Sequence, residues 1–287
     1  MNIKVIRLII SIIISIVIFL FILFAVLQNK NLGRIYDIIF SKSTPKVVYK
    51  AEETIKVLEG WTDYDIANYF AEQGKWSSGD ILDVTESASS TKYFTRKYNF
   101  FDGIEKPKSL EGYLFPDTYR IFASSTVSDI LVKMLDNFDH KLTPQMRADI
   151  KSQNKSISEI VIMASIIEKE APFHGQDNGD AKIVSGIFWN RIRNNQALQS
   201  DATLSFILRD NKPAHSGNEL NNTSLYNTYK YRGLTPGPIC NPGLLAIEAA
   251  IYPTKTSYNY FLTAPDGNIY YAKTYDDHLQ NKYKYLK

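Results

Sequence analysis

The stretch "IVIMASIIEKEAP", residues 160–172, predicts a helix that is buried over most of its surface. At about 100° per residue, apolar side chains cover most of the helical wheel, while Ser165 and Lys169 share its one polar sector. Pro172 ends the helix, because the residue before a proline avoids the helical conformation. We therefore expect a central helix over Ile157–Ala171 that carries acidic side chains at its end.

The two acids at the end of this helix differ in their expected surroundings. Glu168 lies at the edge of the polar sector, whereas Glu170 falls between Met163 and Ile166. A solvated, salt-bridged helix end is the ordinary interpretation of such a sequence. A buried carboxyl instead raises its pKa or finds a partner, and a carboxyl that stays protonated near neutral pH can act as a general acid. Periodicity alone leaves both interpretations open.

The rest of the chain predicts an α+β protein that is mostly helical, without an internal repeat. A strand is expected over Thr54–Gly60, and a helix after it begins with Thr62 and Asp65 at capping-box spacing. Near the C-terminus, a β-hairpin is expected around residues 265–267. The remaining expected elements are a short helix opening at Ser77–Asp80 and helices over Val127–Phe138, Pro144–Gln153, Ala181–Asn195 and Asn241–Pro253, the last capped by Asn241.

The N-terminal region has the composition of a membrane anchor. Leu8–Leu27 comprises twenty residues with no charge and only two serines, which is the length that a helix needs to cross a bilayer. A cleavable signal peptide would have a shorter apolar region and a small-x-small site, so we expect an uncleaved transmembrane anchor over residues 1–28. A polar linker is expected over residues 29–50. Basic residues flank both sides of the apolar stretch, so charge alone leaves the orientation open.

Composition argues against several classes of function. Thirty-three basic and 30 acidic side chains give a net charge of +3, with no basic run that would indicate a nucleic-acid partner. The single Cys240 cannot form an intramolecular disulfide. The four histidines are scattered and no pair has ligand spacing, so we expect neither a metal nor a cofactor.

Several long motifs, taken together, resemble one enzyme family. They are "IVIMASIIEKEA" at 160–171, "LQSDAT" at 198–203 and "YNTYKYRGLTPGPICNPGLLAIEAA" at 226–250, with "LEGYLFPDTY" at 110–119 before them. In this order they look like the YceG-like (MltG-like) endolytic murein transglycosylases. The resemblance runs from Glu52 to the C-terminus. It implies a LysM-like strand-helix module over residues 51–108 and a YceG-like catalytic domain over 109–287; members commonly carry two LysM-like segments, and this chain has room for one.

The resemblance also implies a reaction. Such enzymes cut peptidoglycan strands internally at the bond from N-acetylmuramic acid to N-acetylglucosamine, using the muramyl 6-hydroxyl instead of water, and leave 1,6-anhydro ends. The family's catalytic glutamate corresponds to Glu170, which would protonate the leaving oxygen and then remove the proton of the 6-hydroxyl. Asp201 is the candidate for a second carboxylate if the enzyme is a hydrolase.

Candidate substrate contacts come from the other motifs, each with a plain alternative. The tyrosines of "YNTY" can pack on sugar faces or fill a core. The Gly/Pro-rich segment "GLTPGPICNPG" can form a groove wall or a simple turn, and "SDAT" can belong to a site or cap a helix. We expect substrate binding by Gln199, Asp201, Thr203, Tyr226, Asn227, Tyr229, Gly237 and Asn241. We expect supporting roles, by salt bridge or orientation, for Glu168, Asn190 and Arg191.

Two other functions remain open at this point. One is a membrane-anchored scaffold that binds peptidoglycan without cleaving it, and the other is a hydrolytic muramidase. The resemblance places the catalytic domain outside the cytoplasm on the cytoplasmic membrane, as a single-pass protein. It also suggests a partnership with a peptidoglycan synthase complex and a role in ending strand elongation, although no residue identifies the partner.

Overall fold

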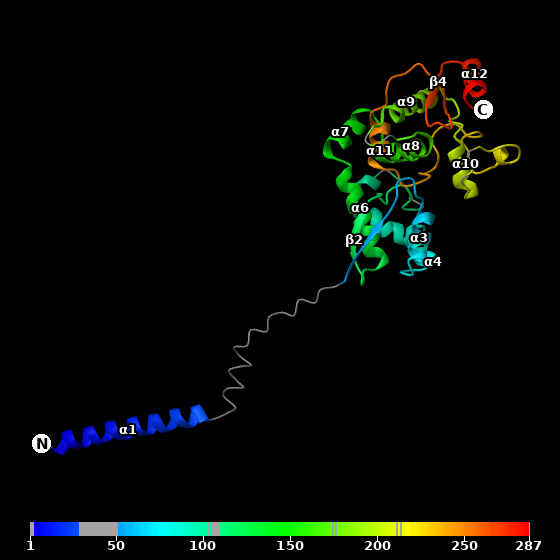
Figure 1. Ribbon diagram of the computed structural model, residues 1–287. Coiled ribbons are helices and arrows are strands. Elements are labelled where there is room, and N and C mark those ends of the chain that lie inside the picture. Colours follow the sequence, from blue (N-terminus) through cyan, green and yellow to red (C-terminus); the bar gives the residue numbers. More distant parts are fainter. Residues whose placement is uncertain are drawn as a thin grey trace. The chain divides into compact units, whose positions relative to one another are not determined.

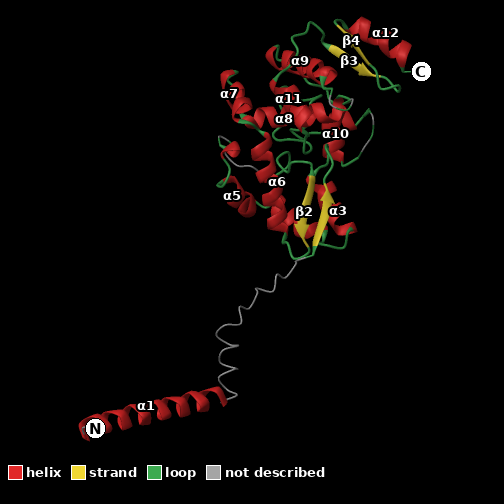
Figure 2. Cartoon of the chain, turned by 60° about the vertical axis from the view of Figure 1, so that its left-hand side comes forward, coloured by secondary structure: helices red, strands yellow, loops and turns green. Residues whose placement is uncertain are grey.

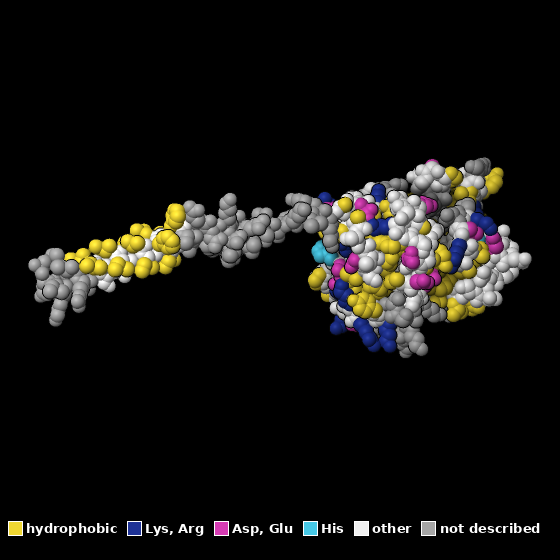
Figure 3. All heavy atoms as spheres, turned by 90° about the horizontal axis from the view of Figure 1, so that it is seen from below, with side chains coloured by type: hydrophobic (Ala, Val, Ile, Leu, Met, Phe, Trp, Pro, Cys, Tyr) yellow, Lys and Arg dark blue, Asp and Glu magenta, His cyan; other side chains and the backbone are white. Residues whose placement is uncertain are grey.

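The computed structural model describes residues 3–28, 51–102, 104, 109–173, 175, 177–210, 212 and 214–286, which belong to two compact units, residues 1–50 and 51–287. In the first unit, α1 (Ile3–Gln28) is helical (Figure 1). Its large apolar side chains between residues 9 and 24 are exposed and cover much of its visible surface in Figure 3. Over the described parts of the chain, no helix meets the criteria for a membrane span. The linker expected over residues 29–50 lies outside the described residues.

The second unit begins with a two-stranded antiparallel sheet. Strand β1 (Glu52–Lys56) pairs with β2 (Thr118–Phe122), with Ile55 opposite Tyr119, and the two strands lie side by side in Figure 2. The expected strand was wrong at its C-terminal end, because the chain leaves the sheet after Lys56 and turns at Gly60, where φ is +77°. Since β2 lies beyond residue 109, this sheet joins the two regions that the sequence assigns to separate domains.

Short helices connect the two strands. They are α3 (Asp63–Glu72), α4 (Ser78–Thr85), α5 (Ala88–Thr95) and the 3-10 turn η1 (Asn99–Phe101). The capping boxes of Thr62 with Asp65 and of Ser77 with Asp80 are both present, so these helix starts were predicted correctly. The LysM-like character of this region stays a prediction.

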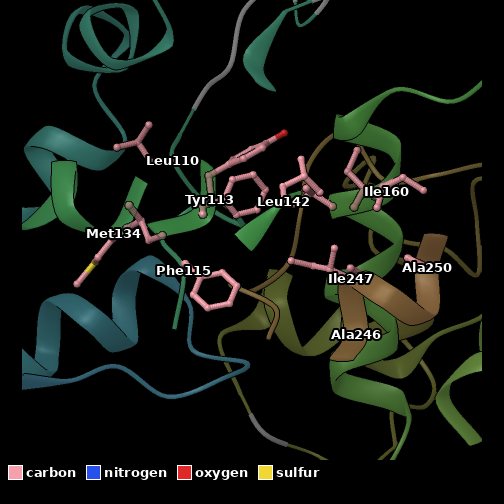
Figure 4. Close-up of a cluster of buried hydrophobic side chains, with 14 of the residues drawn as sticks. Leu110, Tyr113, Phe115, Met134, Leu142, Ile160, Ala246, Ile247 and Ala250 are labelled. Atoms are coloured by element: carbon pink, nitrogen blue, oxygen red, sulfur yellow. The ribbon is translucent and has the colours of Figure 1, made fainter. Parts of the chain in front are cut away.

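The predicted central helix is α8 (Ile157–Glu170), and all eight residues from Ile160 to Ile167 are buried. It packs against α7 (Pro144–Ser152), α9 (Gly179–Arg193), α10 (Asp201–Leu208) and α11 (Leu244–Ile251). Figure 4 shows Ile160 of α8 together with Ala246, Ile247 and Ala250 of α11 in the hydrophobic core. The second unit also contains α6 (Val127–Lys141) and the 3-10 turn η2 (Glu219–Asn221).

The C-terminal region contains the predicted hairpin, β3 (Tyr260–Thr263) antiparallel to β4 (Ile269–Ala272). A final helix, α12 (Tyr275–Tyr285), packs on this hairpin and was not predicted. The fold is therefore a mixed, largely helical one with two small antiparallel sheets.

One predicted helix start is wrong. We expected Asn241 to cap α11, but α11 begins at Leu244 with Gly243 as its N-cap. The Asn241 side chain is fully buried and bonds to distant segments of the chain, accepting from the backbone N–H groups of Gly112 and Leu114 at 2.9 Å each. The Asn241 amide, which the local sequence assigns to the start of α11, is therefore used for contacts with the distant segment of Gly112 and Leu114.

Candidate active site

Glu170 is the last residue of α8, and its carboxyl group is held at one oxygen only. The Ser200 hydroxyl donates to Oε1 at 2.5 Å, and the backbone N–H of Ala202 donates to the same oxygen at 3.5 Å. The hydrogen bonds of the described residues include none to Oε2. Since the side chain is only partly buried, Oε2 is available to an incoming group.

The start of α10 explains why the hydroxyl points at Glu170. Ser200 occupies the N-cap position of α10, yet its side chain makes no cap hydrogen bond. The Glu170 carboxylate instead accepts from Ala202, in the first turn of α10, where free N–H groups favour a negative charge. Ser200 therefore links the end of one helix to the start of another through the candidate acid.

Opposing effects set the proton affinity of Glu170. Burial is the largest and raises the pKa of its carboxyl, while the hydrogen bonds from Ser200 and Ala202 lower it. The neighbouring charge of Asp201 raises the pKa and that of Arg191 lowers it, with a net result above the ordinary glutamate value. Glu170 thus retains its proton at higher pH than an exposed glutamate does, as a general acid requires.

Two adjoining pockets, of about 480 and 310 Å³, form a surface feature that we call the groove. They share Ser109, Glu111, Ser224 and Tyr226 in their walls. The groove reaches Ala202, which bonds to Glu170, and is therefore connected to the candidate acid.

A separate pocket of about 370 Å³, which we call the basic pocket, is lined in part by Arg191, Gln199 and Tyr229. Arg191 and Tyr229 both interact electrostatically with Glu170. Glu170 itself lines neither hollow, but residues of both interact with it: Ala202 of the groove by a hydrogen bond, and Arg191 and Tyr229 of the basic pocket by charge.

Half of the eight predicted substrate contacts line one of these hollows. Tyr226 and Gly237 line the groove, and Gln199 and Tyr229 line the basic pocket. The Tyr226 ring lies 5.1 Å from that of Phe206, centroid to centroid, and burial raises the pKa of its hydroxyl to about 12. Tyr226 therefore remains a neutral hydrogen-bonding group at the groove wall.

Three predicted contacts are buried and bonded to protein instead. The Thr203 hydroxyl donates to the Ser200 carbonyl at 2.8 Å, and the Asn227 amide donates to two backbone carbonyls. Both side chains, like that of Asn241, belong to residues that are almost completely buried. Their positions support the loops that form the site and leave no surface for direct contact with a sugar.

Asp201, the eighth of these residues, is partly exposed but already has protein partners. Its Oδ1 accepts from the backbone N–H of His215 at 3.0 Å and lies 3.4 Å from Nδ1 of the same residue. A hydrogen bond with Asp201 also contributes to raising the pKa of Tyr229. Asp201 thus joins the His215 segment to the wall of the basic pocket.

The three residues with predicted supporting roles each connect the site to another element. Glu168 accepts from the Gly243 N–H at 3.0 Å, and burial raises the pKa of its carboxyl to about 7. The Asn190 amide donates to the Thr256 carbonyl at 2.9 Å. Arg191 donates to the carbonyls of Leu198, at 2.5 Å, and Asn259, at 2.8 and 3.2 Å. Among the residues that the structure describes, no three metal-ligating side chains gather together.

Comparison with known protein families identifies the family of this chain. Residues 24–284 match the model described as the YceG-like family. The chain belongs to the YceG-like family. A yceG-like protein from Listeria monocytogenes, solved at 2.6 Å, has the same fold with a TM-score of 0.70 and 33% identity, over 79% of this chain and 75% of that one.

Two relatives of this YceG-like chain carry the name endolytic murein transglycosylase. The Bacillus subtilis (strain 168) protein is 31% identical over 263 residues, which is 89% of this chain and 71% of that protein. The protein of Streptococcus pneumoniae serotype 2 (strain D39) is 37% identical over 180 residues, covering 60% of this chain and 31% of that protein. The chain thus spans most of the Bacillus relative and about a third of the streptococcal one.

Ser200 is the side chain in contact with Glu170 that the sequence did not reveal. The motif "LQSDAT" drew attention to Gln199, Asp201 and Thr203, but a serine before a helix is ordinarily read as its cap. No local sequence signal pointed to Ser200, because its bond to Glu170 joins residues thirty positions apart.

Proposed function

We propose that this YceG-like chain is an endolytic murein transglycosylase in which Glu170 serves as acid and then as base. One observation carries the assignment of Glu170: its carboxyl has one oxygen anchored by Ser200 and Ala202, while the other accepts no hydrogen bond from the described residues. The names of the relatives support peptidoglycan as the substrate.

The reaction follows from the two protonation states of Glu170. The protonated carboxyl donates its proton to the glycosidic oxygen, whose bond to the anomeric carbon of the muramyl residue breaks. The resulting carboxylate removes the proton of the muramyl 6-hydroxyl, and that oxygen bonds to the anomeric carbon. No water is consumed, and Glu170 ends the cycle protonated. Donation by Ser200 and Ala202 stabilises the carboxylate that exists between the two transfers.

The contacts of Asp201 favour this pathway over hydrolysis. A hydrolase ordinarily places a second carboxylate where it activates water or attacks the sugar. The Asp201 carboxylate is instead bonded to the backbone of His215 and interacts with Tyr229. One acid with an intramolecular nucleophile therefore accounts for the site more simply than two acids with water.

The groove supplies binding surface on one side of the acid. It presents the rings of Phe206 and Tyr226 together with polar groups such as Asn68 and Ser224. Aromatic rings pack on sugar faces, and hydroxyl and amide groups pair with sugar hydroxyls and acetamides. The two pockets of the groove, of about 480 and 310 Å³, offer room for more than one contact with a strand.

Attachment and partners belong to the same proposal. Residues 8–27 anchor the chain in the cytoplasmic membrane, and the catalytic region lies outside the cytoplasm, where the glycan is. This rests on the uncharged sequence of that stretch and on the location of the substrate. The region 51–108 is a LysM-like module, and a peptidoglycan synthase complex that supplies nascent strands is the partner.

The test is product analysis by mass spectrometry. The full chain in detergent micelles, its Glu170→Gln variant and an exposed control, Glu72→Gln, are incubated with purified peptidoglycan. We expect 1,6-anhydromuramic ends from the wild type and the control and none from Glu170→Gln. Reducing ends would instead identify a hydrolase, and the absence of cleavage by folded wild type would leave only a binding role.

A further inference from the structure

The basic pocket differs in charge from the groove. Three cationic residues line it, Arg191, Lys230 and Arg232, and its lining includes no acidic side chain. The groove, in contrast, is lined by both signs of charge, with Asp65, Glu86, Glu111 and Asp210 beside Lys169 and Arg209. With a volume of about 370 Å³, the basic pocket is in the size range of small-ligand sites.

Two of the three cations are free to meet a ligand. Lys230 and Arg232 are exposed, and neither takes part in an ion pair among the described residues. Arg191 is nearly buried, with its guanidinium held by the backbone carbonyls of Leu198 and Asn259. Carbonyl groups orient this guanidinium, and Glu170 is the acidic side chain that interacts with its charge. The positive charge that the pocket offers to a ligand therefore comes chiefly from Lys230 and Arg232.

Neutral donors complete the lining. The side chains of Asn195 and Gln196 are exposed on one wall, next to Gln199. Asn195 and Gln199 both have φ of +53°. The Tyr229 side chain, which interacts with Asp201, is part of the same lining.

The basic pocket adjoins the acid that, in the proposed function, acts on the muramyl residue. A muramyl residue carries a lactyl ether, and from it a stem peptide with free carboxylates. Arg and Lys side chains bind carboxylates by charge-assisted hydrogen bonds. We propose that the basic pocket binds carboxylates of the stem peptide on the muramyl residue that is being cleaved. This inference rests on the proposed function and adds a determinant of substrate choice.

The experiment compares three sets of uncrosslinked glycan strands. One carries stem peptides with free carboxylates, one carries stems whose carboxylates are amidated, and one has been stripped of peptide and retains only the lactyl carboxylate. The full chain is compared with Lys230→Gln/Arg232→Gln and with a control, Lys92→Gln/Lys151→Gln, which removes two exposed charges from α5 and α7. The measurement is kcat/KM for each strand, with the thermal midpoint of each variant as a check on folding.

We expect the pocket variant to lose about tenfold in kcat/KM on strands with free stem carboxylates, mostly through KM, and less than twofold on the other two. The control should match wild type on all three. Wild-type cleavage of stripped strands with anhydro ends would uphold the proposed function whatever the pocket variant does.

Four outcomes would overturn the inference. An equal loss on all three strands would place the sugar itself in the pocket, and a loss confined to the stripped strands would place the lactyl carboxylate there. No loss on any strand would mean that the pocket does not bind substrate. Failure of wild type to cleave any strand would remove the proposed function, and this inference with it.

Discussion

Two acidic sites in the second unit have raised pKa values but opposite relations to their surroundings. At the first, Glu170 stands alone with one free oxygen. At the second, Asp63 and Glu111 form a pair in which both Glu111 oxygens are bonded, Oε2 to the Asp63 N–H at 3.0 Å and Oε1 to the Asn241 amide at 3.1 Å. Burial is the largest cause of the shift in every case.

The difference shows that a raised pKa alone does not identify a catalytic acid. Asp63 and Glu111 are 1% and 6% exposed, and with Asn241 they tie the start of α3 to the "LEGYLFP" segment. Gly112 in that segment has φ of +88° and packs so tightly on Pro238 that a Cβ would lie 2.4 Å from its ring. The pair therefore maintains the packing between these segments, and Glu170 is left to meet substrate.

The sharpest test of this comparison is to neutralise each acid in turn. Glu170→Gln should lower kcat about a thousandfold, because a general acid and base is lost, while leaving the thermal midpoint unchanged or slightly higher. Glu111→Gln should retain most activity and shift the thermal midpoint. Turnover and differential scanning calorimetry on the same preparations measure both effects. A stable but inactive Glu111→Gln would contradict the division of roles.

Removing the amide that organises the pair should have the next largest effect. Asn241→Ala leaves the N–H groups of Gly112 and Leu114, and Oε1 of Glu111, without a partner in a buried region. We expect a loss of about 3–4 kcal/mol in the free energy of unfolding, measured by urea denaturation. As the matched control, the exposed Asn194→Ala should cost less than 0.5 kcal/mol. A small effect at Asn241 would mean that water replaces its amide.

The pair also predicts how stability depends on pH. Folding raises the pKa of Asp63 to about 7 from 3.8, so the folded state binds its proton more tightly than the unfolded state. The contribution is therefore present at low pH and is lost as pH rises through about 7. We expect the contribution of Asp63 to the free energy of unfolding to fall by about 2 kcal/mol between pH 5 and pH 8.

Asp63→Asn is the variant that separates this cause from others. The asparagine cannot titrate, so the dependence of unfolding free energy on pH should become weaker. Glu168, whose pKa is also raised to about 7, accounts for the pH dependence that is left. Denaturation midpoints at half-unit steps of pH give the slope. An unchanged slope in Asp63→Asn would assign the dependence to other groups.

Local patterns predicted the elements far better than the contacts between them. Caps at Thr62 and Ser77, the buried face of α8 and the C-terminal hairpin all follow from residues within one turn or strand. The partner of β1, in contrast, lies more than sixty residues away. The helix α12 was missed because its sequence is polar and none of its residues is buried.

The candidate site shows the same limit at the level of single residues. Glu170 was found because its position conflicts with the apolar face of its own helix. Thr203, Asn227 and Asn241 were chosen as ligands because of their chemical type, yet they are almost completely buried in the fold. Polarity alone does not tell a sugar contact from a buried hydrogen bond, since both satisfy the same donors and acceptors.

Ser200 offers the finest test, because its effect on Glu170 is electrostatic and modest. Its hydroxyl lowers the pKa of the carboxyl, so Ser200→Ala should raise that pKa further. The alkaline limb of kcat/KM against pH should then shift to higher pH, because the acid stays protonated to higher pH. The maximal rate should fall about fivefold, because the carboxylate form of Glu170 loses a hydrogen bond. Ser200→Thr retains the hydroxyl and should restore the wild-type profile. If Ser200→Ala kept the wild-type alkaline limb, the Ser200 hydroxyl would not affect the pKa of Glu170 and would only pack against it. The backbone N–H of Ala202, at the start of α10, would then be the group that stabilises the Glu170 carboxylate.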